Sequence, residues 1–212
     1  MVLHINIKYI MLVAKNKFIL RDSNDKEKNL EMKNLNDIPH VPFYHCLKDS
    51  NSLEGNFKRK NNERIKNSLF CLLEDDANYI DKVILEKYSK EYLKASKLSF
   101  VEQCSILNMN KEKYVTVSKT ERSIVISYIE NNSVIKKSLL DTKVDIAEVE
   151  AVIKDYMYID RFESIPLYIN NVNDNMSEFS SMGIIVGKEE IFENARKYGS
   201  IHGCLGKFCG IS

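Results

Sequence analysis

Apolar and polar residues alternate along the second half of the chain in the pattern of three strands, a helix and a further strand. Residues 114–118 alternate, residues 124–129 form a nearly continuous β-branched run, and residues 134–140 follow an Asn-Asn-Ser turn. Asp145, with Glu148 three positions later, forms the capping box of a predicted helix. The buried stripe of this helix comprises Ile146, Val149, Val152, Ile153, Tyr156 and Met157. Residues 165–169 then predict the closing strand of a βββαβ unit.

The first half shows the same order with a weaker signal. Residues 4–13 and 17–22 predict a hairpin, and residues 29–33 predict a third strand. Asn61 and Asn62 can cap a helix whose apolar positions are Ile65, Leu69, Leu72 and Leu73. Residues 83–85 then predict a short strand. The two halves therefore indicate a duplicated unit.

This duplication predicts two domains, residues 1–110 and residues 111–212. Residues 34–60 carry two prolines and a basic run at 58–60, which indicates a loop insertion in the first domain. The connection at 90–108 is predicted to be partly helical. The second domain continues with a short strand at 183–186, a helix over 188–198 that Gly199 ends, and a tail rich in glycine and cysteine.

Two tandem βββαβ units of the ribonuclease-H-like type resemble the small actin-like α/β fold of actin, sugar kinases and Hsp70. A more local resemblance lies in residues 67–76, Asn-Ser-Leu-Phe-Cys-Leu-Leu-Glu-Asp-Asp, followed by a strand at 82–87. This segment resembles the cytoplasmic domain of the type II secretion L protein, in which an apolar helix closes with Leu-Glu-Asp. The related type IV pilus M protein has a similar actin-like body.

The resemblance implies a platform subunit that docks a secretion or pilus assembly ATPase to the inner membrane. The L protein continues into a membrane helix, whereas these 212 residues contain no such segment. The apolar run at 9–14 is bounded by Lys8 and Lys15 and is too short to span a bilayer. We therefore expect a cytoplasmic protein that is held at the inner membrane by its partners. Whether it forms a homodimer is left open by the sequence.

Composition argues against several other classes. Lys and Arg total 31 against 30 Asp and Glu, so the net charge of +1 offers no field for steering the protein to nucleic acid. Five widely spaced cysteines fit a reducing compartment better than a disulfide framework. Of the seven glycines only Gly55 precedes Gly183, so a glycine-rich phosphate loop is absent from most of the sequence.

Nucleotide hydrolysis in this fold needs two tight hairpins in which Asp and Gly approach phosphate. At the expected positions stand residues 13–17, Val-Ala-Lys-Asn-Lys, and residues 118–122, Ser-Lys-Thr-Glu-Arg. The strand that should end in a glycine pair ends in Asn170 and Asn171. The sequence predicts no ATP hydrolysis and no cofactor, and residual binding through Gly183, Gly187 and Lys188 stays open.

Metal and nucleophile chemistry have weak candidates. His40 and His45 meet the histidine spacing of zinc sites, next to Cys46, while Cys204 and Cys209 near His202 are spaced one residue too far. A nucleophilic set of Cys46, His45 and Asp49 lacks a strained elbow, and adjacent side chains on a strand point to opposite faces. We predict neither a metal site nor a catalytic residue.

Glu74, Asp75 and Asp76 are the candidate partner-binding residues. Placed at the end of the predicted helix, they would face the negative end of its dipole at a cost of about 0.3–1 kcal/mol per charge. Such a cluster favours a cationic surface on the partner ATPase. A solvated helix end is the plainer alternative.

Two other functions compete with a non-catalytic scaffold of a secretion, pilus or DNA-uptake machine. One is a nucleotide-binding enzyme or nuclease of the same superfamily. A nuclease needs carboxylates that hold two metals about 4 Å apart, and residues 114–118 contain none. The other is a regulator with an unrelated α+β fold.

Overall fold

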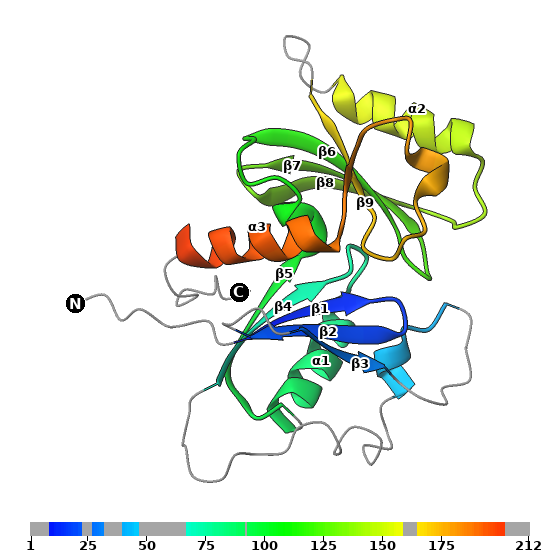
Figure 1. The fold of residues 1–212 in the computed structure, drawn as a ribbon. Coiled ribbons are helices and arrows are strands. Elements are labelled where there is room, and N and C mark those ends of the chain that lie inside the picture. Colours follow the sequence, from blue (N-terminus) through cyan, green and yellow to red (C-terminus); the bar gives the residue numbers. More distant parts are fainter. Residues whose placement is uncertain are drawn as a thin grey trace.

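The computed structural model describes residues 9–22, 27–31, 40–46, 67–91, 93–158 and 165–201. These residues form two five-stranded mixed sheets, with strand orders β3-β2-β1-β4-β5 and β10-β9-β6-β7-β8. Each sheet is built from one half of the chain, as the duplicated pattern predicted. We call the first sheet with α1 the first lobe, and the second sheet with α2 the second lobe (Figure 1).

The first sheet begins with an antiparallel meander. Its strands are β1 (Tyr9–Ala14), β2 (Lys17–Asp22) and β3 (Glu27–Glu31). Asn16 takes a positive φ of 59° in the tight turn between β1 and β2, a conformation that Asn tolerates. Two further strands, β4 (Asn67–Leu73) and β5 (Ala95–Glu102), run parallel to β1.

The second sheet repeats this arrangement. Its meander comprises β6 (Lys113–Lys119), β7 (Ile124–Glu130) and β8 (Ser133–Leu140). Asn131 and Asn132 both have positive φ values, 50° and 59°, which suit the two-residue turn between β7 and β8. The short strands β9 (Leu167–Asn170) and β10 (Ile184–Val186) run parallel to β6.

Helices lie outside and between the two sheets. In Figure 1, α1 (Tyr79–Glu91) covers the outer face of the first sheet and α2 (Ile146–Met157) the outer face of the second. Between the sheets lie α3 (Lys188–Ile201) and a short 3-10 helix, η3 (Gln103–Ile106). Two other 3-10 turns are η1 (Phe43–Cys46), packed near α1, and η4 (Ser177–Phe179).

The helix and strand predicted for residues 61–85 are wrong in type. Residues 67–73 form strand β4, because the run Leu-Phe-Cys-Leu-Leu is buried on both faces, as in a central parallel strand. Residues 83–85 lie inside α1. This helix begins with a reciprocal cap. Asn78 Oδ1 accepts hydrogen bonds from the backbone N–H of Ile80 and Asp81, and Asp81 accepts one from Asn78.

Other boundaries also differ from the prediction. The segment 90–108 is partly helical, as predicted, since it contains the end of α1 and the short helix η3, but strand β5 lies between them. Gly199 does not end α3, which continues to Ile201. The third strand, predicted at 29–33, is confirmed over 29–31 and begins two residues earlier, at Glu27, while residues 32–33 lie outside the described residues. The predicted helix caps Asn61 and Asn62, most of the insertion 34–60 and the tail also lie outside them.

The predictions for the second half are confirmed in type. Asp145 is confirmed as the N-cap of α2, since its side chain accepts from the Ala147 N–H. The chain thus has the predicted α/β fold of two mixed sheets. Among the described residues, no helix combines the length and the apolar character needed to cross a membrane.

Candidate functional site

The candidate site lies where the ends of the central strands of both sheets meet. The loops after β1, β4, β6 and β9 all emerge on the side where the lobes face each other (Figure 1). Polar contacts join these loops across the gap. The Lys15 backbone N–H, in the first hairpin, donates to Asn173 Oδ1 at 2.7 Å. A nucleotide in an actin-like fold would occupy this region between the two hairpins, so the side chains here decide what the protein can bind.

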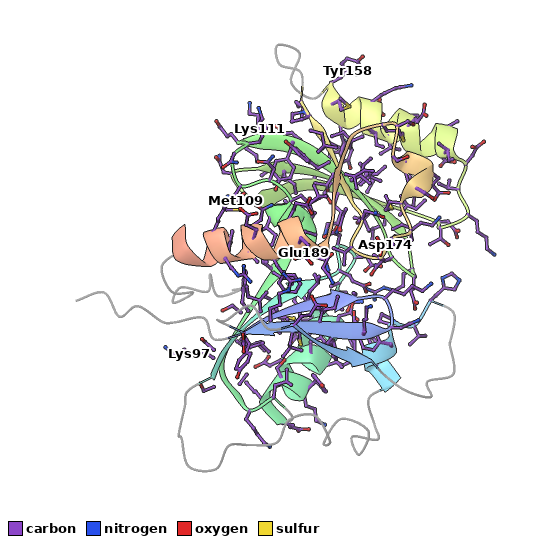
Figure 2. All side chains as sticks on the ribbon, in the orientation of Figure 1. Lys97, Met109, Lys111, Tyr158, Asp174 and Glu189 are labelled. Atoms are coloured by element: carbon purple, nitrogen blue, oxygen red, sulfur yellow. The ribbon has the colours of Figure 1, made fainter. Side chains whose placement is uncertain are left out.

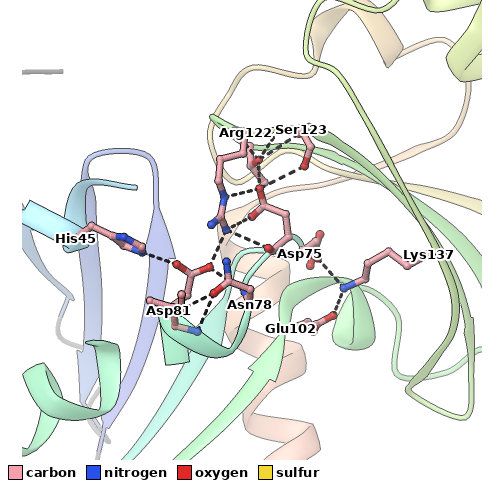
Figure 3. Close-up of polar contacts among 11 residues, drawn as sticks. His45, Asp75, Asn78, Asp81, Glu102, Arg122, Ser123 and Lys137 are labelled. Carbon is pink, nitrogen blue, oxygen red and sulfur yellow. Dashed lines mark hydrogen bonds and ion pairs between the residues drawn. The ribbon is translucent and has the colours of Figure 1, made fainter. Parts of the chain in front are cut away.

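The second hairpin is fastened to the first lobe by Arg122. Its guanidinium donates to both carboxylate oxygens of Asp76, at 2.9 and 3.0 Å, and to the Asp76 carbonyl at 3.0 Å. A further bond of 2.9 Å reaches Asp81 Oδ2 at the start of α1. Thr120 Oγ1 also donates to Asp76, at 2.6 Å. Figure 3 shows this fork-like contact from the β6–β7 turn to the first lobe.

Asp81 links this contact to η1. Its side chain is fully buried, and its second oxygen lies 2.5 Å from His45 Nε2. Burial by itself favours the neutral carboxyl, but hydrogen bonds from the Asn78 backbone, Arg122 and His45 outweigh it and lower the pKa of Asp81. We call Arg122, Asp76, Asp81 and His45 the clasp. It is a chain of charge-assisted contacts that spans both lobes.

A second group of polar side chains lies deeper between the lobes. Gln103 Nε2 donates to the Val13 carbonyl at 2.7 Å, and Asn170 Nδ2 donates to Gln103 Oε1 at 2.9 Å. Asp75 accepts from the Cys104 N–H at 2.7 Å and from Asn170 at 3.2 Å. Burial raises the pKa of Asp75 despite these bonds. Strand ends of both sheets are therefore bonded to each other directly.

The remaining space is small. A pocket of about 210 Å³, solvent included, is lined by Glu74, Asp75, Gln103, Ser118, Lys119, Thr120, Asn170 and Asn173. Glu74 is buried here, and desolvation followed by the charge of Asp76 raises its pKa to about 8. The Glu74 carboxyl therefore lies beside the pocket largely in its protonated form at neutral pH.

The predicted partner-binding residues Glu74, Asp75 and Asp76 come together at this site, but in a different setting. They follow strand β4 rather than a helix, so the predicted unfavourable helix dipole is absent. Glu74 and Asp75 are 8% and 1% exposed, and the Asp76 side chain is 3% exposed. Their role in binding a partner stays a prediction, and a partner could reach them only if the lobes separated.

The other sequence candidates lie apart from one another. His40 is exposed, whereas His45 belongs to the clasp, and the described part of the chain contains no cluster of His, Cys, Asp or Glu that could hold a metal. His202, Cys204, Cys209 and Asp49 lie outside the described residues. Lys188 bonds Glu27 at 3.1 Å, and a Cβ on Gly183 would lie 2.6 Å from the Leu167 carbonyl oxygen. Gly183 is therefore required by close packing of β9 against β10.

Several site residues escaped the sequence analysis. In the sequence Arg122 stands out only as a bulky replacement in a phosphate hairpin, and nothing marks Gln103, Asp81 or Asn170 as members of a polar network. Asn78 with Asp81 three positions later is a capping pattern that could have located both α1 and Asp81. No sequence signal could have paired Arg122 with Asp76, which is 46 positions away.

Comparison with known proteins supports the fold. Neither a protein-family model nor a curated protein sequence matches this chain. Among solved structures it is similar to the ethanolamine utilization protein EutJ from Carboxydothermus hydrogenoformans, with a TM-score of 0.50 and 10% identity over 89% of this chain and 86% of that one. The fold is actin-like.

Two further structures are similar at lower scores. One is a Bacteroides thetaiotaomicron protein of unknown function with an actin-like ATPase fold, with a TM-score of 0.48 and 10% identity over 90% of this chain and 96% of that one. The other is the cytoplasmic domain of EpsL, an inner-membrane component of the type II secretion system of Vibrio cholerae, with a TM-score of 0.43 and 8% identity over 94% of this chain and 95% of that one.

Proposed function

We propose that the protein is a non-catalytic adaptor with an actin-like fold, which holds its lobes closed without a nucleotide and presents its outer surfaces to other proteins. The observation that carries this proposal is the clasp. Arg122 of the second hairpin bonds Asp76 and Asp81 of the first lobe, in the space where hairpin backbones would have to approach a phosphate. Because Arg122 is already bonded to these two carboxylates, its guanidinium is not available to a phosphate while the clasp is closed.

The packing of the lobes supports the same proposal. Ile191, Phe192 and Ala195 of α3 are fully buried in the core between the sheets, together with Leu12 and Leu72 of the first sheet. Arg21 on β2 bonds both oxygens of Glu189 on α3, at 2.7 and 2.8 Å. A nucleotide-driven opening of the lobes would have to break this apolar contact as well as the clasp.

We place this adaptor in the cytoplasm, in a bacterial type II secretion, type IV pilus or DNA-uptake machine, where it would dock an assembly ATPase to the inner-membrane platform. The two-lobed fold and the likeness of residues 67–76 to the L protein motivate this setting. Because residues 67–73 form a strand, the likeness is one of sequence and not of a shared helix.

The test combines titration calorimetry with Mg-ATP and co-purification with the assembly ATPase of the same cell. We expect no heat of binding and a stable complex with the ATPase. Micromolar ATP affinity would refute the nucleotide-free part, and absence of a complex would refute the partner. The variant Arg122→Ala serves as a control for the role of the clasp in excluding ATP. It removes the side chain between the hairpins and leaves the outer surfaces unchanged.

One observation favours an enzyme as the second candidate. Glu74 is a buried carboxyl with a pKa of about 8 beside a pocket, which is the setting of many general acids and bases. ATP or nucleic-acid turnover by the purified protein that Glu74→Gln abolishes would favour this candidate over the adaptor.

A further inference from the structure

Helix α1 carries an apolar patch on the side that faces away from its own lobe. Leu85 and Tyr88 point into the core beneath the first sheet, as expected for an amphipathic helix. On the opposite side Tyr79, Ile80 and Val83 are 75%, 61% and 45% exposed. These three large apolar side chains lie within two helical turns and form an exposed patch that does not contribute to the packing of α1 on its own sheet.

The patch continues into a basic surface. Residues 82–94 contain four lysines and two glutamates, a net charge of +2 in a chain whose total is +1. Lys87, Lys90 and Lys94 are exposed. One of the two glutamates, Glu86, is paired with Lys90, and Asp81 in the first turn of α1 is buried and bonded to Arg122 and His45. The charge that α1 presents to the outside is therefore positive.

The shape of this surface narrows the choice of partner. Helix α1 lies on the far side of the first sheet from α3 and forms the outer layer there (Figure 1). Lys97 lies at the edge of the same sheet (Figure 2), but its register opposite Ser68 turns it to the inner face, so it takes no part in this surface. Thirteen residues at 1.5 Å each give α1 a length of about 20 Å. A single outward helix with apolar residues at one end and lysines towards the other suits an extended anionic surface better than a pocket in a partner protein.

We propose that α1 binds the surface of a membrane that contains anionic lipid. Tyr79, Ile80 and Val83 enter the boundary between headgroups and acyl chains, while the lysines contact lipid phosphates. Burying this small patch gives weak binding by itself, and the electrostatic attraction of the lysines adds to it. This inference does not depend on the proposed function, in which the protein reaches the membrane only through its partners.

The test is co-sedimentation of the full chain with vesicles of phosphatidylcholine alone and with vesicles that also contain phosphatidylglycerol. We expect binding only to the anionic vesicles, weakened by salt. Ile80→Asp should reduce the binding constant about tenfold, since it removes an inserted side chain and adds a negative charge. Lys87→Glu should reduce it by about fivefold or more, because one basic residue near the surface accounts for roughly that factor.

Ile184→Asp is the matched control. Ile184 is 55% exposed, close to the value for Ile80, but lies on β10 of the second lobe. Its substitution should leave vesicle binding unchanged, and thermal melts should show that all variants are folded. Asp at position 80 is compatible with the first turn of a helix, where negative charge is favourable.

Absence of binding to anionic vesicles, equal binding to both vesicle types, or equal losses for Ile80→Asp and Ile184→Asp would each overturn the proposal. If the protein did not bind vesicles and Ile80→Asp instead disrupted a complex with another protein, the exposed side of α1 would be the binding surface for that protein, and the membrane proposal would be wrong.

Discussion

The two lobes meet through two contacts of opposite character. On one side α3 inserts Phe192 and Ile191 into an apolar core shared with the first sheet, and all of these side chains are excluded from water. On the other side the clasp joins Arg122 to Asp76 and Asp81, which are also buried but charged. Both contacts hold the same two lobes together. A difference in how much each contributes to stability therefore reflects the chemistry of the contact.

Apolar burial stabilises the folded state directly, whereas buried ion pairs have to offset the cost of removing charges from water. The apolar contact therefore supplies most of the free energy that holds the lobes together. The clasp fixes how the hairpins are positioned, because a guanidinium fork bonds a carboxylate in only a few geometries. Substitutions on the two sides should differ in size and in how they can be rescued.

The largest effect is expected on the apolar side. Phe192→Ala should lower the free energy of unfolding by about 3–5 kcal/mol, since it leaves a cavity between the sheets and removes the ring beneath the Arg21 guanidinium. Urea denaturation followed by circular dichroism measures the change. Glu193→Ala, one position along the same helix but exposed to solvent, should leave the midpoint almost unchanged. Equal losses for both variants would contradict the assignment of the apolar contact as the main source of stability.

Arg122→Ala should cost about 2–4 kcal/mol, because Asp76 and Asp81 stay buried without their cation. The loss should be partly recovered by adding Asp76→Asn, which removes one uncompensated charge. Lys119, at the start of the same turn as Arg122, forms a more exposed ion pair with Glu178 of η4. Lys119→Ala breaks this pair and should lower the free energy of unfolding by no more than ~1 kcal/mol. Denaturation of the three variants separates these cases, and no recovery in the double variant would argue against electrostatic strain.

The smallest effect should depend on pH and come from Glu74. Its pKa is raised to about 8 in the folded protein, against 4.5 as the ordinary value, so the folded state binds more protons than the unfolded state between these limits. Stability from this group is therefore lost as the pH rises from about 4.5 to 8. Glu74→Gln should be about 1–3 kcal/mol more stable than the parent above pH 8, with little difference near pH 4.5. Unfolding free energies across this range test the sign. A variant that is less stable than the parent at high pH would show that the Glu74 charge is favourable.

The fold could be predicted from sequence where the local pattern and the burial agree. In the second half, alternation on β6, the Asn131–Asn132 turn and the Asp145 cap all specify their elements locally, and they are confirmed. In the first half β4 is a continuous apolar run. Such a run is found both in strands in the middle of a sheet and in buried helices. The type of that segment depends on its neighbours β1 and β5, which the local pattern does not contain.

The site was predicted less well, and for a related reason. Glu74, Asp75 and Asp76 stood out because three carboxylates in succession are unusual, but their meaning comes from residues distant in sequence. Arg122 compensates Asp76 and Asp81, while Asn170 contacts Asp75 from the opposite sheet. A charge cluster seen without its counter-charges looks like an exposed binding surface.

The position of α3 has a consequence for how this chain is made. Helix α3 comes after every strand of both sheets, yet it covers the inner face of the sheet that is synthesised first, and its Glu189 bonds Arg21 across 168 positions. Until residues 188–201 leave the ribosome, Ile10, Leu12, Phe70 and Leu72 lack the part of their cover that α3 supplies. A nascent chain would expose some of this apolar surface for most of its synthesis, so folding is completed only when α3 has emerged.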